Sequence, residues 1–419
     1  MPAQSVLLPP TFRAIARLSE TDVSFSSSLA LYRVPYFAPA TLAVLLTVLA
    51  EAMAGSYTAL LAVQKLGMSP LELSAFLTLA AGSGIIVTTI FGHMHDRRAR
   101  MWPVYLSLVG KIGASALCVV VTEPWALYLV AVVLFGLSSA TFPLLFAIAK
   151  GYLDRAGSDA TVRGMASLRM TSSLGWAIGP AIAAGLVATW SFAGVFLGSA
   201  VLGVIALVTV ALSGIRPQPN AGVAPPKVTL EVVRATAPAV IALTAFNTAM
   251  LMGGNAMSVV VVRELGSEAD VGLLLSLCAL LEVFIMGAFV VRPSLSHHRG
   301  LLLAGFGLFV AYFVLVLAVP TLAALYWGQI PRAAAIGIVS IVGMARLQDM
   351  LPGRAGIASA LFGNTMSAGA LLSGLGTGVW AEAFGYWSLF AVGAVLCVIG
   401  GVAMAWPARA ALSGASSSP

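Results

Sequence analysis

The sequence predicts an all-α polytopic membrane protein, with twelve transmembrane helices arranged as two pseudo-symmetric bundles of six. Three observations lead to this fold class. Only 9% of the 419 residues carry a formal charge, whereas a typical soluble domain has about 25%. Hydrophobic residues make up 60% of the chain, and the mean hydropathy is +1.00. Apolar segments of spanning length recur between short polar interruptions. An ordinary soluble enzyme and a disordered chain are excluded, because neither accommodates so much apolar surface.

Twelve apolar segments are long enough to cross a bilayer, which takes about 20 residues each. In the first half the predicted helices cover 36–63, 71–93, 102–121, 126–149, 165–188 and 191–213. In the second half they cover 237–262, 271–291, 300–319, 321–345, 356–380 and 386–406. The long segment between the two sets is rich in proline, glycine and charge, which is typical of a loop. We therefore expect five regions: a cytoplasmic tail 1–35, a bundle 36–213, a cytoplasmic loop 214–236, a bundle 237–406 and a cytoplasmic tail 407–419.

Lys and Arg are distributed unevenly between the two sides of the predicted membrane. With both termini in the cytoplasm, the tails hold four, the 2–3, 4–5 and central loops three each, and the 8–9 and 10–11 loops two each. This places 17 on the cytoplasmic side and only Lys65 and Arg263 on the other. The remaining three, Lys111, Arg169 and Arg332, fall within predicted helices. Because cytoplasmic loops of membrane proteins are enriched in Lys and Arg, we expect both termini in the cytoplasm.

The other compositional features exclude several classes of function. The net charge is +7 and the pI about 9.6, but no basic stretch interleaved with aromatic residues indicates nucleic-acid binding. The N-terminal tail lacks the apolar core and cleavage site of a secretory signal. The sequence contains no phosphate loop, no Ser–His–Asp set and no metal-ligand cluster, and its 3 cysteines lie in apolar runs. We therefore expect no enzymatic activity, no cofactor and no metal.

The loop after the second predicted helix reads FGHMHDRRARMW. Gly92 allows close packing at the end of this helix, and Asp96 is suited to accept hydrogen bonds from a helix N-terminus in the other half. A glycine, an aspartate four residues later and then basic residues resemble the loop signature of the major facilitator superfamily, although Ala99 stands where a glycine is usual. The resemblance implies the major facilitator fold and a loop motif that controls conformation, made by Gly92, Asp96, Arg97 and Arg100.

Further stretches resemble one branch of this superfamily, the bacterial sugar efflux transporters. They are LRMTSSLGWAIGP in the fifth helix, GGNAM in the seventh, LLEVF in the eighth, RLQDMLPGRAG after the tenth and LFGNTMSAG in the eleventh. The resemblance extends over all twelve helices and implies a monomeric secondary active transporter in the bacterial inner membrane. It also implies export of sugars or related small polar solutes. Arg332 departs from the family pattern, which has an uncharged polar residue there, so the particular solute stays open.

Polar side chains inside the predicted helices are the candidate substrate-binding residues. A charge in the membrane interior is costly, so a retained one should face a partner or an aqueous cavity. Amides and carboxylates bind sugar hydroxyls, and an aromatic face packs against the C–H surface of the ring. Each side chain can instead bond to a neighbouring helix, and Lys111 can reach the interface or pair with Glu51. The candidates for a cavity between the halves are Arg169, Trp176, Asn255, Gln329, Arg332, Asn364, Thr365 and Tyr57.

Uphill transport without an ATP site requires an ion gradient, and we expect the exchanged ion to be a proton. Glu282 is the first candidate for the proton carrier, because it lies well inside a helix and is too short to reach the interface. Glu51 is the second candidate. Two alternatives stay open. The same fold could export drugs, which a cavity of aromatic residues and methionine would favour, or it could be a non-transporting sensor, which would need a signalling domain.

The distribution of Lys and Arg makes the orientation testable. A single cysteine engineered within residues 219–226, in a cysteine-free background, should react with a membrane-impermeant maleimide only after the cells are opened. Labelling of this site from outside intact cells would contradict the cytoplasmic location of the termini.

Overall fold

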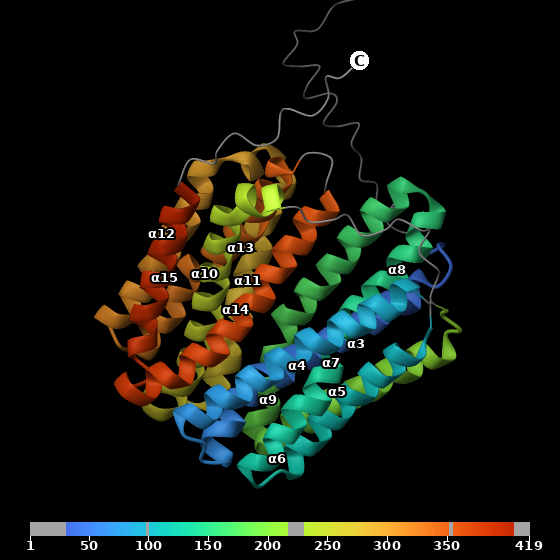
Figure 1. Ribbon diagram of the computed structural model, residues 1–419. Coiled ribbons are helices and arrows are strands. Elements are labelled where there is room, and N and C mark those ends of the chain that lie inside the picture. The colour runs from blue at the N-terminus through green and yellow to red at the C-terminus, as the bar shows by residue number, and fades with distance from the viewer. Residues whose placement is uncertain (1–30, 98–99, 217–229, 352–354, 406–419) are drawn as a thin grey trace, which may run out of the picture.

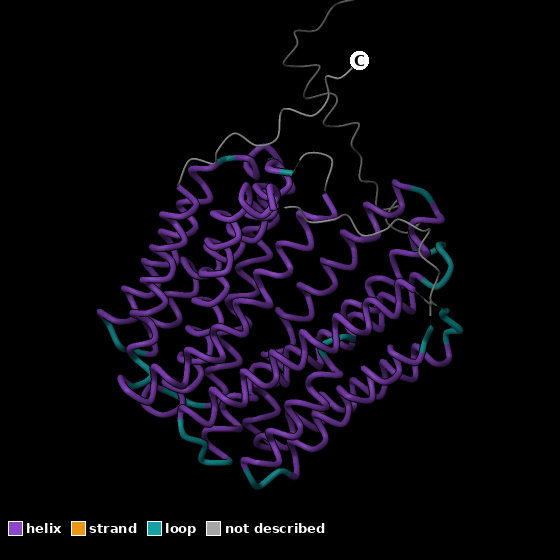
Figure 2. Tube along the Cα trace, viewed as in Figure 1, coloured by secondary structure: helices purple, strands orange, loops and turns teal. Residues whose placement is uncertain are grey.

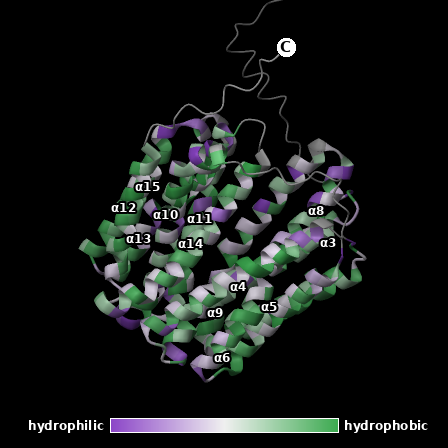
Figure 3. Cartoon of the chain, in the orientation of Figure 1, coloured by the Kyte–Doolittle hydropathy of each residue, from purple (hydrophilic) through white to green (hydrophobic). Residues whose placement is uncertain are grey.

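The computed structural model describes residues 31–97, 100–216, 230–351 and 355–405. These residues are almost entirely helical, with short connections between the helices (Figure 2). Large hydrophobic residues are exposed along most of the helices. Figure 3 colours most of the helical ribbon as hydrophobic, and hydrophilic residues gather towards the two ends of the molecule. An outward-facing apolar surface is the arrangement that a lipid bilayer requires, and the all-α polytopic fold class is confirmed.

The first half of the chain contains six elements that cross the molecule. The first is α3 (Phe37–Leu60) continued by η1 (Leu61–Lys65), the second is α4 (Pro70–Arg97) and the third is α5 (Trp102–Val120). The fourth is formed by four consecutive elements, α6 (Pro124–Leu129), η2 (Val130–Phe135), α7 (Gly136–Ser138) and α8 (Thr141–Ala156). The fifth and sixth both belong to α9 (Ser158–Leu212). The long α9 contains two crossings, because its backbone leaves helical geometry at Trp190 and Ser191. This break coincides with the boundary that the sequence predicts between the fifth and sixth helices.

The second half repeats this plan. It contains α10 (Leu230–Val260) with η3 (Val261–Leu265), α11 (Glu268–Val291), η4 (Pro293–His297), α12 (Arg299–Ala318), α13 (Leu322–Met350), α14 (Ala355–Phe384) and α15 (Ser388–Ala405). The first helix of each half ends in a π-helical turn, η1 in one and η3 in the other. The start of α10 differs from the sequence prediction, because its first turns occupy part of the segment expected to be loop.

The number of spanning helices follows from three observations. Ten helices of the described residues are long and apolar enough to cross a membrane. One of these ten contains the two crossings of α9, and α14 adds a further helix of 30 residues. By length the described residues therefore form twelve helical segments, and ten helices also meet the criterion of apolar composition.

The two halves meet along two seams, α4 against α14 and α9 against α11 (Figure 1). At the α9–α11 seam a side chain on Gly272 would collide with the Pro180 carbonyl and the Tyr57 hydroxyl. At the α4–α14 seam a side chain on Gly378 would collide with the Pro70 carbonyl. Close backbone approach through small residues is the usual way for helices to pack within membranes.

These contacts lie at one end of the molecule, near the start of α4 and α11. Towards the other end, which holds the 2–3 loop, the same helix faces are exposed. Ile85 and Thr89 continue the face of α4 that carries Thr78, and Gly363 and Ser367 continue the facing side of α14. All four are exposed, and nothing lies within 4 Å of a side chain built on Gly363. The halves are therefore closed together at one end and apart at the other.

The packed seam predicts the effect of a single substitution. Gly378→Val should force α4 and α14 apart and lower the stability of this conformation by about 1–3 kcal/mol, the usual cost of overpacking. Spin labels at the exposed positions Leu71 and Phe384 report the separation of the two halves at this end by pulsed electron resonance. The label distance should increase in Gly378→Val and stay unchanged in the control Gly363→Val. An unchanged distance in Gly378→Val would contradict the closed seam.

Candidate substrate cavity and charged residues

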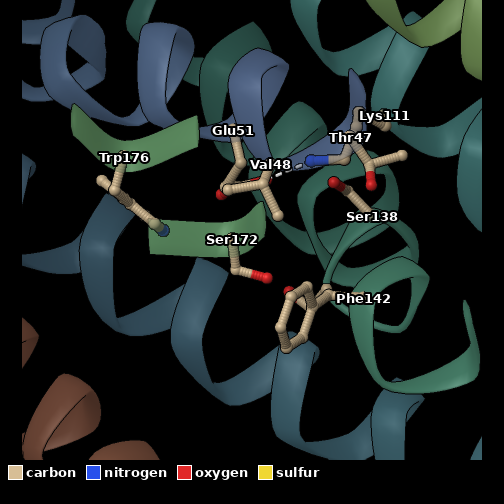
Figure 4. Close-up of a pocket in the computed structure, with 9 residues that line it drawn as sticks. Thr47, Val48, Glu51, Lys111, Ser138, Phe142, Ser172 and Trp176 are labelled. Carbon is tan, nitrogen blue, oxygen red and sulfur yellow. Dashed lines mark hydrogen bonds and ion pairs between the residues drawn. The ribbon is translucent and has the colours of Figure 1, made fainter. Parts of the chain in front are cut away.

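A cavity with a volume of about 330 Å³ lies among the described residues of the first half. Four crossings supply its walls, so residues far apart in the sequence face one space (Figure 4). Its nine lining residues combine one ion pair, four hydroxyl side chains and two aromatic rings. They are Thr47, Val48, Glu51, Lys111, Ser138, Ser139, Phe142, Ser172 and Trp176.

Glu51 on α3 and Lys111 on α5 form an ion pair at this cavity (Figure 4). The two partners differ sharply in exposure, because the Glu51 side chain is 50% exposed and that of Lys111 only 6%. The ammonium is therefore withdrawn into the helix packing, and the carboxylate faces the open space. Pairing with Glu51 is one of the two roles that the sequence allows for Lys111, and it removes the cost of an isolated buried cation.

Three of the four hydroxyl groups around the cavity donate their hydrogens to carbonyl groups of their own helices. Thr47 donates to the Ala43 carbonyl at 2.8 Å, and Ser139 donates to the Phe135 carbonyl at 2.9 Å. Ser172 donates to the Leu168 carbonyl at 2.9 Å. Because these three hydroxyl hydrogens are engaged, the three oxygens offer lone pairs to a ligand. Together with the Glu51 carboxylate they make the cavity rich in hydrogen-bond acceptors.

Trp176 stands one helical turn after Ser172 on α9, so both share the face that lines the cavity. Its side chain is 45% exposed. An accessible indole offers an apolar face to a sugar ring and one N–H donor at its edge. Trp176 is thus the member of the predicted binding set that lines this cavity. Arg169, seven residues earlier on the same helix, is exposed but is not among the lining residues.

Gln329 and Arg332 form a separate buried cluster inside the second half. Arg332 is 5% exposed and Gln329 is 0% exposed. The Arg332 guanidinium donates to Gln329 Oε1 at 2.9 Å, lies 3.8 Å from the sulfur of Met257 and stacks 5.9 Å from the ring of Tyr312. Gln329 in turn donates to the Leu325 carbonyl at 2.9 Å. In this conformation the pair is enclosed within its own half.

Glu282 is half-buried on α11, one turn after Cys278. The Cys278 thiol lies 3.5 Å from Glu282 Oε1. Arg332 on α13 interacts with Glu282 electrostatically, but within the described residues no ion pair closer than 4.0 Å joins them. Glu282 therefore has a cation nearby but forms no ion pair with it, whereas Glu51 forms an ion pair with Lys111.

The remaining predicted binding residues lie in other places. Tyr57 is buried in the α9–α11 seam, where its hydroxyl donates to the Glu268 carbonyl at 2.9 Å. Thr365 is buried and accepts a 3.2 Å hydrogen bond from Asn247. Asn364 beside it is exposed, and Asn255 is half-buried on α10. Tyr57 and Thr365 thus make helix–helix contacts in this conformation, because each side chain is directed into a packed interface.

The predicted loop motif lies at the open end of the molecule. Gly92 belongs to α4, and a side chain built on it would meet nothing within 4 Å. The close packing expected at Gly92 is therefore absent in this conformation, since the halves are apart there. Arg100 is exposed, and the side chains of Asp96 and Arg97 lie outside the described parts of the structure.

A second cavity, of about 270 Å³, lies at the closed end between the two halves. Trp387 donates to Glu264 at 2.6 Å on its rim, and Arg263 stacks 5.4 Å from the ring of Tyr386. Burial raises the pKa of the Tyr386 phenol, and the nearby Arg263 opposes that shift.

Among the described residues, no group of three or more His, Cys, Asp or Glu could hold a metal ion.

Comparison with known proteins gives a consistent result. The sequence pattern of the family described as Major Facilitator Superfamily matches residues 40–374. A Deinococcus radiodurans protein named "Putative sugar efflux transporter" is 37% identical over 90% of this chain and 98% of its own length. "Sugar efflux transporter A" of Escherichia coli strain K12 is 27% identical over 80% of this chain and 87% of its own length.

Solved structures support the fold alone. The crystal structure of the nucleoside transporter NupG superposes with a TM-score of 0.71 at 15% identity, covering 88% of this chain and 98% of that one. A peptide transporter, POT, superposes with a TM-score of 0.70 at 16% identity, covering 88% and 94%. Both likenesses extend over the two halves of the chain.

Sequence reasoning missed most of the cavity wall. Thr47 precedes Glu51 by one turn, and Ser172 precedes Trp176 by one turn, so helical spacing could have identified both. Ser138 and Ser139 follow the π-helix η2, whose altered helical period hides their direction from a periodicity argument.

The unequal exposure of the ion pair predicts unequal effects of mutation. Glu51→Gln leaves a buried ammonium without its counter-ion, whereas Lys111→Met leaves a carboxylate that water in the cavity can solvate. Breaking a fully buried pair costs about 3–5 kcal/mol, and the loss here should approach that range only for Glu51→Gln. Thermal unfolding of the purified protein should therefore show a lower melting temperature for Glu51→Gln than for Lys111→Met. The double variant should recover part of the loss, and equal melting temperatures for the two single variants would refute the asymmetry.

Proposed function

The chain belongs to the sugar efflux transporters of the major facilitator superfamily, and on that premise we propose that it exports sugars or related small polar solutes in exchange for protons. Family membership makes it a transporter rather than an enzyme. The relatives' names supply the class of solute, and the acceptor-rich cavity beside Trp176 is the observation that supports it here. Sugar hydroxyls donate to acceptors of this kind, while the indole covers the C–H face of the ring.

Alternating access is proposed from the arrangement of the seams. The halves touch at one end through glycine contacts and leave the opposite end accessible. If the two halves rock about the solute, the packed seams part and the exposed faces of α4 and α14 come together. The Lys and Arg distribution assigns the open end to the cytoplasm, so this conformation would receive solute from inside a bacterial cell.

Glu282 is proposed as the proton carrier. A carrier must exchange its proton during each cycle, so it needs a carboxyl group that is stable in both charge states. Glu282 fits this requirement, because it is half-buried within α11 and no ion pair within 4.0 Å engages it among the described residues. Glu51 is less suited, because it is already engaged as the counter-ion of the buried Lys111 ammonium.

The residues that line the cavity favour sugars over lipophilic drugs as the solute. Export of drugs by the same fold would call for a cavity of aromatic residues and methionine, whereas the cavity contains an ion pair and hydroxyl groups beside two aromatic rings. Counterflow of radiolabelled solutes into proteoliposomes, run with a panel of sugars and a panel of lipophilic drugs, separates these functions. Exchange of sugars without exchange of drugs is expected, and the reverse result would overturn the proposal.

Glu282→Gln tests the proton step, because glutamine keeps the shape and hydrogen bonding of the side chain but cannot ionise. Efflux driven by a pH gradient should fall to the level of empty liposomes, whereas exchange of labelled for unlabelled sugar should continue. Glu382→Gln, at an exposed position near the closed end, is the matched control and should retain both activities. Gradient-driven efflux that survives Glu282→Gln would move the proton site elsewhere, and loss of both activities would assign Glu282 to sugar binding.

A further inference from the structure

We propose that the Glu51–Lys111 pair is a charge filter, which admits neutral sugars to the cavity and rejects phosphorylated ones. The inference rests on the proposed function and concerns a role of these residues in specificity. It starts from the direction of the pair, since Glu51 is half-exposed to the cavity and Lys111 is buried behind it. Both residues line the cavity, but a ligand that enters meets mainly the carboxylate, because it is the more exposed partner.

The Glu51 carboxylate serves as the counter-ion of the buried Lys111 ammonium. A buried cation without a counter-ion is strongly unfavourable in a membrane protein, so the pairing holds the carboxylate in place at the cavity. Because half of its side chain is exposed, Glu51 turns negative charge towards an incoming anion and repels it.

The rest of the wall offers no second cation to compensate a negative ligand. Lys111 is the only cationic residue among the nine that line the cavity, and its charge is paired with Glu51. Thr47, Ser139 and Ser172 donate their hydroxyl hydrogens to helix carbonyls and present acceptors to the cavity. A phosphate dianion accepts hydrogen bonds and donates none, so it is mismatched in charge with Glu51 and in hydrogen bonding with these three oxygens, and the Trp176 indole N–H offers it one donor.

A neutral sugar is complementary to the same wall. Its hydroxyl groups donate to the Glu51 carboxylate and to the Thr47, Ser139 and Ser172 oxygens, and its ring packs on Trp176. The filter therefore separates two molecules that share a sugar ring and differ in charge. An exporter with such a cavity releases free sugars and retains the sugar phosphates that kinase reactions form inside the cell.

The experiment uses the full chain in proteoliposomes, with counterflow of radiolabelled glucose and three unlabelled competitors: glucose, 6-O-acetylglucose and glucose 6-phosphate. The acetyl ester adds bulk at the same carbon without charge. In the wild type both neutral sugars should compete, and glucose 6-phosphate should be at least tenfold weaker, which corresponds to about 1.4 kcal/mol. Equal competition by glucose 6-phosphate, or equal exclusion of the neutral ester, would overturn the filter.

Variants then assign the exclusion to the carboxylate. Glu51→Gln and the double variant Glu51→Gln with Lys111→Gln should both reduce the discrimination to less than threefold, and the double variant leaves no unpaired ammonium to disturb folding. Glu51→Asp keeps the charge and should keep the discrimination, as should the distant control Glu382→Gln. Glucose itself should bind more weakly to the glutamine variants, because Glu51 also accepts hydrogen bonds from the sugar, so the discrimination is the ratio of the two competitors within each variant. Folded glutamine variants that still discriminate tenfold would overturn the role assigned to Glu51, and complete loss of glucose exchange would assign Glu51 to sugar binding instead of charge selection. Wild-type vesicles that exchange no sugar would instead refute the proposed function.

Discussion

The cost of placing charge in an apolar medium constrains every polar feature of this protein. Within the spanning helices, Lys111 is paired with Glu51, and the Arg332 guanidinium is held by Gln329 and by contacts with Met257 and Tyr312. Each arrangement lowers the penalty of burial in a different way. The ion pair gives the buried ammonium its counter-ion at the cavity. Glu282 lies in the field of Arg332, but among the described residues it forms no ion pair within 4.0 Å.

The same constraint explains why glycine holds the halves together. Hydrophobic attraction between helices is weak in lipid, so a stable yet separable seam relies on close backbone contact. Gly272 and Gly378 provide that contact at one end, and Ser74 adds hydrogen bonds to the Gly374 and Leu375 carbonyls across the seam. These contacts involve few side chains and no ion pair. A modest difference in solute or proton binding between the two conformations could therefore shift the balance between them.

The sequence predicts much of the fold, because hydropathy and the distribution of Lys and Arg report directly on the bilayer. The break at Trp190 and Ser191 lies between two apolar runs that the sequence separates. The site was harder to predict, because a polar residue in a helix does not reveal which neighbour it faces. Trp176 lines the cavity, whereas Tyr57 and Thr365 bond across helix contacts and Gln329 is enclosed. Only the packing of α3, α5 and α9 brings Glu51, Lys111 and Trp176 together.

In the proposed exchange, sugar binding and proton binding to Glu282 oppose each other. The release of protons when sugar binds measures this opposition most directly. Sugar is added to the purified protein in weakly buffered detergent solution with a pH indicator, and sugar binding is measured in parallel. The account predicts that sugar releases up to about one proton per molecule from the wild type and none from Glu282→Gln, although both bind sugar. Sugar binding without proton release from the wild type, across the neutral pH range, would contradict the account.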